Sequence, residues 1–107
     1  MKALPVSLIN RLPDRILNIH PSLLPKYGGK GFFGIHVHEA VIAAHDTESG
    51  PTVHLVGEEI DKGRILAQTR VPVEEGDTPE TLAARVLVQE HALYWKTIKD
   101  YAAQIGL

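Results

Sequence analysis

The chain has 107 residues, a formal net charge of −2 and no cysteine. This length allows one domain or part of one, and the small net charge argues against a nucleic-acid or acidic-membrane partner. The lack of cysteine excludes a disulfide scaffold and a thiolate zinc site. No run of about 18 apolar residues could span a membrane, and the first residues lack a signal-peptide pattern, so we expect a cytoplasmic protein.

The first predicted elements bring an amide and an imidazole together. Residues 1–14 predict a short helix or turn, and the β-prone residues at 16–19 predict a buried strand that runs into a loop at Pro21. Alternation along the strand places Asn18 and His20 on the same side, where the strand ends. An amide donor beside a titratable imidazole suits a reaction that builds negative charge on a carbonyl oxygen.

A glycine-rich loop and a helix come next. Positions 28–34 hold four glycines, which predicts a mobile loop that carries exposed aromatic residues. From 36 to 45 the apolar residues recur at helical spacing, at Val37, Ala40, Val41 and Ala44. We expect this helix to be closed by residues 49–51.

The rest of the chain predicts two strands and a long helix. Residues 52–56 and 64–73 read as strands that pair antiparallel across a polar loop at 57–63. Thr78 and Pro79 predict the cap and the first position of the helix. Its apolar stripe comprises Leu82, Ala83, Val86, Leu93, Tyr94, Ile98 and Ala102. The loop contains Asp61, whose carboxylate could hold His20 charged and oriented.

Each of these polar residues also has a structural interpretation. In this interpretation Asn18 bonds a loop backbone, His20 is satisfied by a carbonyl, and Asp61 serves a turn. His36 and His38, together with His20 or His54, could instead form a three-histidine metal site. Two aromatic residues on the long helix are expected to pack rather than to stack on a ligand, namely Tyr94 and Trp95.

Four linked motifs carry a family resemblance. They are residues 17–25 (LNIHPSLLP), Gly50 with Thr52-Val53-His54, Ile60-Asp61 with Gly63, and Gln89-Glu90-His91. In this order, and over nearly the whole chain, they resemble the glycinamide ribonucleotide transformylase (phosphoribosylglycinamide formyltransferase) family. The resemblance implies an α/β fold: the C-terminal part of a Rossmann-like formyltransferase sheet, with mixed parallel and antiparallel strands.

The resemblance also implies an activity and a site. The activity is the transfer of a formyl group from 10-formyltetrahydrofolate to the amine of glycinamide ribonucleotide in purine biosynthesis, without a metal. Asn18, His20 and Asp61 match the catalytic residues, and Glu90 matches a contact to the ribonucleotide. The folate pocket maps onto Leu4, Ile9, Ile16, Leu55, Val56, Gly57, Glu58, Glu59, Ile60 and Asp61. A cis peptide bond is implied at Leu24-Pro25.

The sequence departs from the family in two ways. Residues 29–34 look like an insertion, and the chain 1–107 resembles only the C-terminal, folate-binding portion, without the half that binds the ribonucleotide phosphate. We therefore expect little activity from the chain alone, and either a homodimer or a polypeptide that supplies the other half. Formyl-folate hydrolysis and a non-catalytic folate-binding module remain alternatives.

Overall fold

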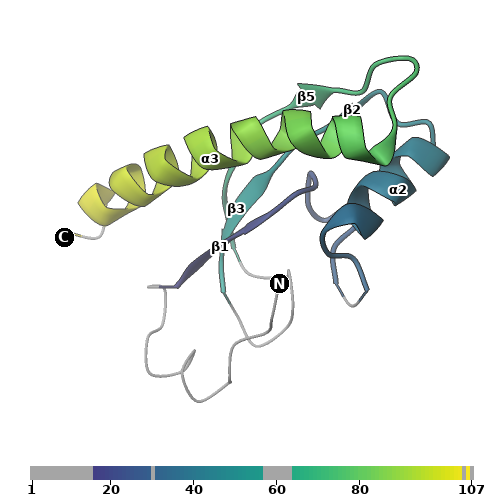
Figure 1. Ribbon diagram of the computed structural model, residues 1–107. Coiled ribbons are helices and arrows are strands. Elements are labelled where there is room, and N and C mark those ends of the chain that lie inside the picture. Colours follow the sequence, from purple (N-terminus) through teal and green to yellow (C-terminus); the bar gives the residue numbers. More distant parts are fainter. Residues whose placement is uncertain (1–15, 30, 57–63, 105, 107) are drawn as a thin grey trace.

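The computed structural model describes residues 16–29, 31–56, 64–104 and 106 (Figure 1). The elements follow in the order β1 (Leu17–His20), α2 (Ile35–Ala43), β2 (Glu48–Ser49), β3 (Thr52–Leu55), β4 (Ile65–Gln68), β5 (Val71–Pro72) and α3 (Pro79–Gln104). The expected strand, helix, strand, strand and helix occur in that order, and the structure adds two short strands, β2 and β5. No helix in the described part of the chain is both long and apolar enough to cross a membrane.

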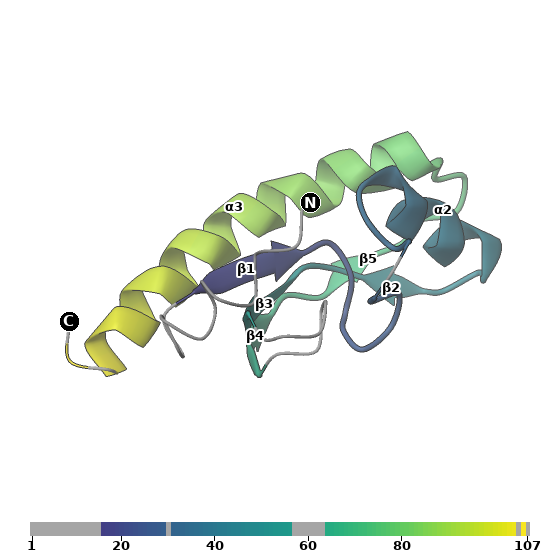
Figure 2. The same ribbon diagram turned by 90° about the horizontal axis from the view of Figure 1, so that it is seen from below.

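A three-stranded sheet carries the predicted site. Its strand order is β1-β3-β4, and β3 pairs antiparallel with both neighbours, with Asn18 opposite His54 and His20 opposite Thr52. The antiparallel pairing expected across residues 57–63 is therefore confirmed. The parallel part of the implied mixed sheet does not occur among the described strands. All four residues of β3 are buried, and α3 lies along one face of the sheet (Figures 1 and 2).

The strand expected over 64–73 is in fact two strands. β4 stays in the main sheet, whereas β5 pairs with β2 in a separate two-stranded sheet. The backbone at Gly50 has φ 137° and passes so close to Thr69 that a side chain at 50 would meet the Thr69 carbonyl oxygen at 1.8 Å. This crossing separates the two sheets, and residues 48–49 form a strand instead of closing the preceding helix.

The core joins α2, β5 and α3. It is centred on Val41, Val71, Leu82 and Val86. The predicted start of α3 is confirmed, because the Thr81 backbone N–H donates to the Thr78 side chain at 3.2 Å and Pro79 occupies the first position. α2 ends two residues before the predicted boundary, since His45 adopts φ 56°.

The packing expected for the two aromatic residues of α3 is half right. Tyr94 is half-buried and its hydroxyl donates to the Leu17 carbonyl at 3.2 Å. Trp95, in contrast, is 73% exposed, so its predicted packing is wrong in the described structure. At 100° per residue, position 95 lies away from the stripe that Val86 and Thr97 bury.

Candidate functional site

His20 closes β1 and is completely buried. Its Nε2 lies 2.7 Å from the backbone carbonyl of Tyr27, seven residues along the chain. Because a carbonyl oxygen can only accept, Nε2 carries the proton in this contact. The ring therefore contacts a carbonyl through Nε2, as in the structural interpretation.

Asn18 lies on the same face of β1 as His20, as the alternation predicts. Its Oδ1 accepts a hydrogen bond from the backbone N–H of Ile19 at 2.9 Å. The acceptor end of the amide is therefore directed to the backbone, and the donor end is the one that can serve an oxyanion.

Much of the predicted site lies outside the described residues. Asp61 is one of the residues that the structure does not describe, so its contact with His20 stays a prediction. The same holds for Leu4, Ile9, Gly57, Glu58, Glu59 and Ile60. The three described members of the expected folate pocket, Ile16, Leu55 and Val56, lie side by side, because the Val56 N–H donates to the Ile16 carbonyl at 2.8 Å. This places them within two residues of Asn18 along the β1–β3 pair.

The loop that follows β1 is held by a buried polar network that the sequence did not reveal. The Thr52 hydroxyl donates to the Ser22 carbonyl at 2.7 Å and accepts from the Leu24 N–H at 3.1 Å. Gln68 donates both to Thr52 (3.0 Å) and to the Leu24 carbonyl (2.9 Å). The cis bond implied at Leu24-Pro25 is present. The sequence signal that could have predicted this network is a threonine and a glutamine within strands that follow a loop containing an X-Pro bond.

The metal alternative finds no support in the described part of the chain, where no three histidine, cysteine or acidic side chains could hold an ion together. His36 is exposed and pairs with Glu39 instead. His38 is buried; burial lowers the pKa of His38, and the charge of nearby His20 lowers it further. His54, opposite Asn18, is buried, and its Nδ1 contacts the Leu55 carbonyl at 3.2 Å.

Glu90 is a half-buried carboxylate on α3. It follows Val86 by four residues and precedes Thr97 by seven, so it belongs to the stripe that faces the rest of the molecule. Burial raises the pKa of Glu90, against the opposite effect of His91. A half-buried carboxylate with a raised pKa is a candidate functional group.

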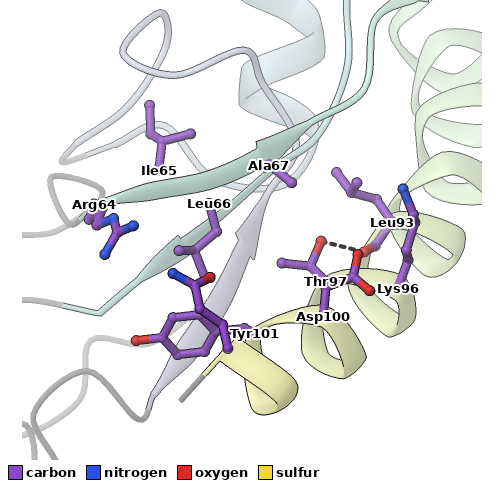
Figure 3. Close-up of a pocket in the computed structure, with 10 residues that line it drawn as sticks. Arg64, Ile65, Leu66, Ala67, Leu93, Lys96, Thr97, Asp100 and Tyr101 are labelled. Atoms are coloured by element: carbon purple, nitrogen blue, oxygen red, sulfur yellow. Dashed lines mark hydrogen bonds between the residues drawn. The ribbon is translucent and has the colours of Figure 1, made fainter. Parts of the chain in front are cut away.

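A cavity of about 160 Å³ lies between β4 and α3 (Figure 3). Leu66, Thr97 and Tyr101 line it, with Arg64, Lys96 and Asp100 among the other lining residues. It contains none of the residues predicted for the site. We therefore regard the end of β1, and not this cavity, as the candidate site.

Comparison with known proteins identifies similar chains. The formyl transferase family pattern matches residues 1–98. A chloroplastic phosphoribosylglycinamide formyltransferase of Arabidopsis thaliana is 56% identical over 92% of this chain and 34% of its own length. The trifunctional purine biosynthetic protein adenosine-3 of Bos taurus is 43% identical over 88% of this chain and 9% of its own. Phosphoribosylglycinamide formyltransferase from Brucella melitensis superposes with a TM-score of 0.84 at 50% identity, covering 96% of this chain and 50% of that one. The chain spans half or less of the length of each of these three relatives.

Proposed function

Because the chain belongs to the formyl transferase family, we propose that it serves the transfer of a formyl group from 10-formyltetrahydrofolate to the amine of glycinamide ribonucleotide in purine biosynthesis. The observation that carries this proposal is the placement of Asn18 and His20 on one face of β1, at the mouth of a loop held by buried hydrogen bonds. The names of the relatives support transfer over the hydrolysis alternative.

The proposed chemistry assigns each polar group a task. The amine nitrogen attacks the formyl carbon, a C–N bond forms, and the carbonyl electron pair moves to oxygen. The Asn18 amide and the Nδ1 proton of a charged His20 donate to this oxyanion. Asp61 keeps His20 charged and assists the proton of the amine. The bond to the folate nitrogen then breaks, and the proton ends on that nitrogen.

The binding residues are proposed from the same resemblance. Glu90 would accept hydrogen bonds from the ribonucleotide, and its place on the packing stripe of α3 supports this role. The folate would lie along Ile16, Leu55 and Val56, with the other expected pocket residues from 4 to 61 completing its surroundings. No step requires a metal.

We further propose that the chain is the C-terminal, folate-binding portion of the enzyme, and that a polypeptide resembling the remaining half of its relatives completes it. Two surfaces support this partner. In the described sheet β1 is an edge strand, which can pair with a further strand. α3 exposes the large apolar side chains of Leu87, Val88 and Trp95, and exposed apolar surface of this kind is suited to a contact with a partner. The test is to mix the chain with such a polypeptide and to measure the mass of the complex that forms. A homodimer of the chain is the competing outcome.

The function is tested by removing His20. The assay follows formyl transfer by the chain combined with the N-terminal half of the Brucella melitensis relative. His20→Ala should lower the rate about 100- to 1,000-fold, the usual effect of a lost oxyanion donor, while formyl-folate binding persists. His36→Ala, on the exposed side of α2, is the matched control and should keep the wild-type rate.

Unchanged transfer in the His20→Ala variant would contradict the proposed roles. Folate binding without transfer in every combination would favour the non-catalytic module, and formyl loss without the ribonucleotide would favour hydrolysis. The cytoplasmic location expected from the sequence stays a prediction, since several relatives carry a chloroplastic name.

A further inference from the structure

We propose that Tyr27 is a positioning residue for His20, and that its hydroxyl bond to Asp46 anchors the catalytic imidazole to the end of α2. This inference deepens the proposed function and rests on it. It concerns two residues that the family resemblance did not single out.

The first argument is the backbone conformation of Tyr27. Its φ of 52° lies in the left-handed region, which side-chain-bearing residues rarely adopt. In this conformation the Tyr27 carbonyl lies 2.7 Å from His20 Nε2. A strained residue keeps such a conformation only where its surroundings enforce it, so some contact must hold Tyr27 in place.

The second argument is the side chain of Tyr27, which supplies that contact. Its hydroxyl donates to Asp46 Oδ2 at 2.8 Å, and its ring meets Phe32 edge-on at 5.9 Å. Burial, followed by the bond to Asp46, raises the pKa of the Tyr27 phenol, so the hydroxyl remains a donor at neutral pH. Lys26 lies 3.9 Å from the same carboxylate oxygen.

Asp46 is itself fixed at the end of α2. Its backbone N–H donates to the Val41 carbonyl at 3.3 Å, and Val41 belongs to the central core. The Asp46 side chain is only 17% exposed. The chain of contacts therefore runs from the core through Val41, Asp46 and Tyr27 to His20.

The consequence concerns the ring nitrogens of His20. A fixed carbonyl acceptor keeps a proton on Nε2 in both the neutral and the charged ring and sets the ring plane. If the hydroxyl bond is lost, the strained backbone can relax and the carbonyl can move away from Nε2. The charged imidazole would then lose its fixed orientation, and the neutral imidazole its defined tautomer.

The test measures the ring ¹⁵N chemical shifts of His20 by NMR in the 107-residue chain, a measurement that needs no activity. Tyr27→Phe keeps the ring and removes the hydroxyl bond, and Asp46→Ala removes the acceptor. Both should shift the neutral His20 from the Nε2–H form to a mixture of tautomers. Asp46→Asn retains an acceptor oxygen and should restore the wild-type shifts.

Tyr94→Phe is the matched control, because it makes the same chemical change and removes a hydroxyl bond to β1 at Leu17. It should leave the His20 signals unchanged. In the complemented enzyme, Tyr27→Phe should lower kcat about tenfold, the effect of one lost hydrogen bond, with an unchanged KM.

Two results would overturn the proposal: wild-type His20 shifts in Tyr27→Phe, or an equal change in Tyr94→Phe, which would indicate general loosening. The proposed function fails separately. If the complemented wild-type chain neither binds formyl-folate nor transfers the group, the function falls, while the NMR response of the Tyr27 and Asp46 variants still decides the anchoring.

Discussion

The loop after β1 and the outward face of α3 differ in how far contacts within the chain cover them. In the loop, the carbonyls of Ser22, Leu24 and Tyr27 each receive a hydrogen bond from a side chain on β3, β4 or β1. On α3, Val88 and Trp95 are 65% and 73% exposed. The site loop is therefore shaped by contacts within this chain, whereas the helix face is suited to a contact with another surface.

The largest expected effect breaks the loop network at Thr52. Thr52→Val keeps the shape of the side chain but removes one donated and two accepted hydrogen bonds in a completely buried position. We expect the free energy of unfolding to fall by about 3 kcal/mol, because buried partners are left unsatisfied. Urea unfolding measures this loss, with the exposed Thr47→Val as control. A loss below about 1 kcal/mol would show that the loop is held elsewhere.

A smaller effect is expected from a substitution at Asp77, which tests whether the N-terminal end of α3 is held by the segment that precedes it. Arg85 donates to Asp77 at 2.7 and 2.9 Å, and the Asp77 side chain is 5% exposed. The hydrogen bond from Arg85 holds the pKa of Asp77 well below its usual range. Asp77→Asn should cost about 2 kcal/mol at neutral pH, as expected for hydrogen bonds to a charged group.

The contribution of the Asp77 carboxylate to the free energy of unfolding depends on pH. A carboxyl whose pKa is lowered in the folded state stabilises above its unfolded pKa of about 3.9, and the gain is lost as pH falls towards the folded value. Thermal unfolding between about pH 5 and pH 2 should thus be flatter for Asp77→Asn than for the wild type. The exposed pair of Arg70 and Glu48 provides a control, because Glu48→Gln should change stability little. Equal acid sensitivity in Asp77→Asn would contradict the assignment.

The smallest expected effect on stability is at Trp95. Trp95→Ser should change the free energy of unfolding of the isolated chain by less than about 0.5 kcal/mol, since the side chain packs little within it. The same substitution should weaken binding of the remaining half, as measured by calorimetry. Lys99→Ser, also exposed on α3, is the control and should bind normally. A strongly destabilised Trp95→Ser chain would show that the outward face of α3, like the loop after β1, is held by contacts within the chain.

Sequence patterns predicted the elements well where local chemistry decides them. The strand at 17–20 and the cap at Thr78 follow from β propensity, alternation and hydroxyl capping, all of which act over a few residues. The break between β4 and β5 was not predictable in this way, because it depends on the approach of Gly50 to Thr69 across the fold. The exposure of Trp95 was missed because an aromatic residue on a helix is usually packed.

The candidate site was predictable in part for the same reason. Alternation correctly placed Asn18 and His20 on one face. The Tyr27 carbonyl contacts His20, and the side chains of Thr52 and Gln68 hold the loop that follows it. All three are residues of ordinary type, and Thr52 and Gln68 bond to partners distant in sequence. Only the fold shows that these side chains converge on the loop.

The tight passage at Gly50 also limits what the chain tolerates there. With no space for even a methyl group between the backbone at 50 and the Thr69 carbonyl, any side chain at position 50 would force these two segments apart. Four residues separate α2 from the small sheet, and α2 contacts α3. A substitution at Gly50 is therefore expected to disturb the packing of α2 as well as the pairing of the strands.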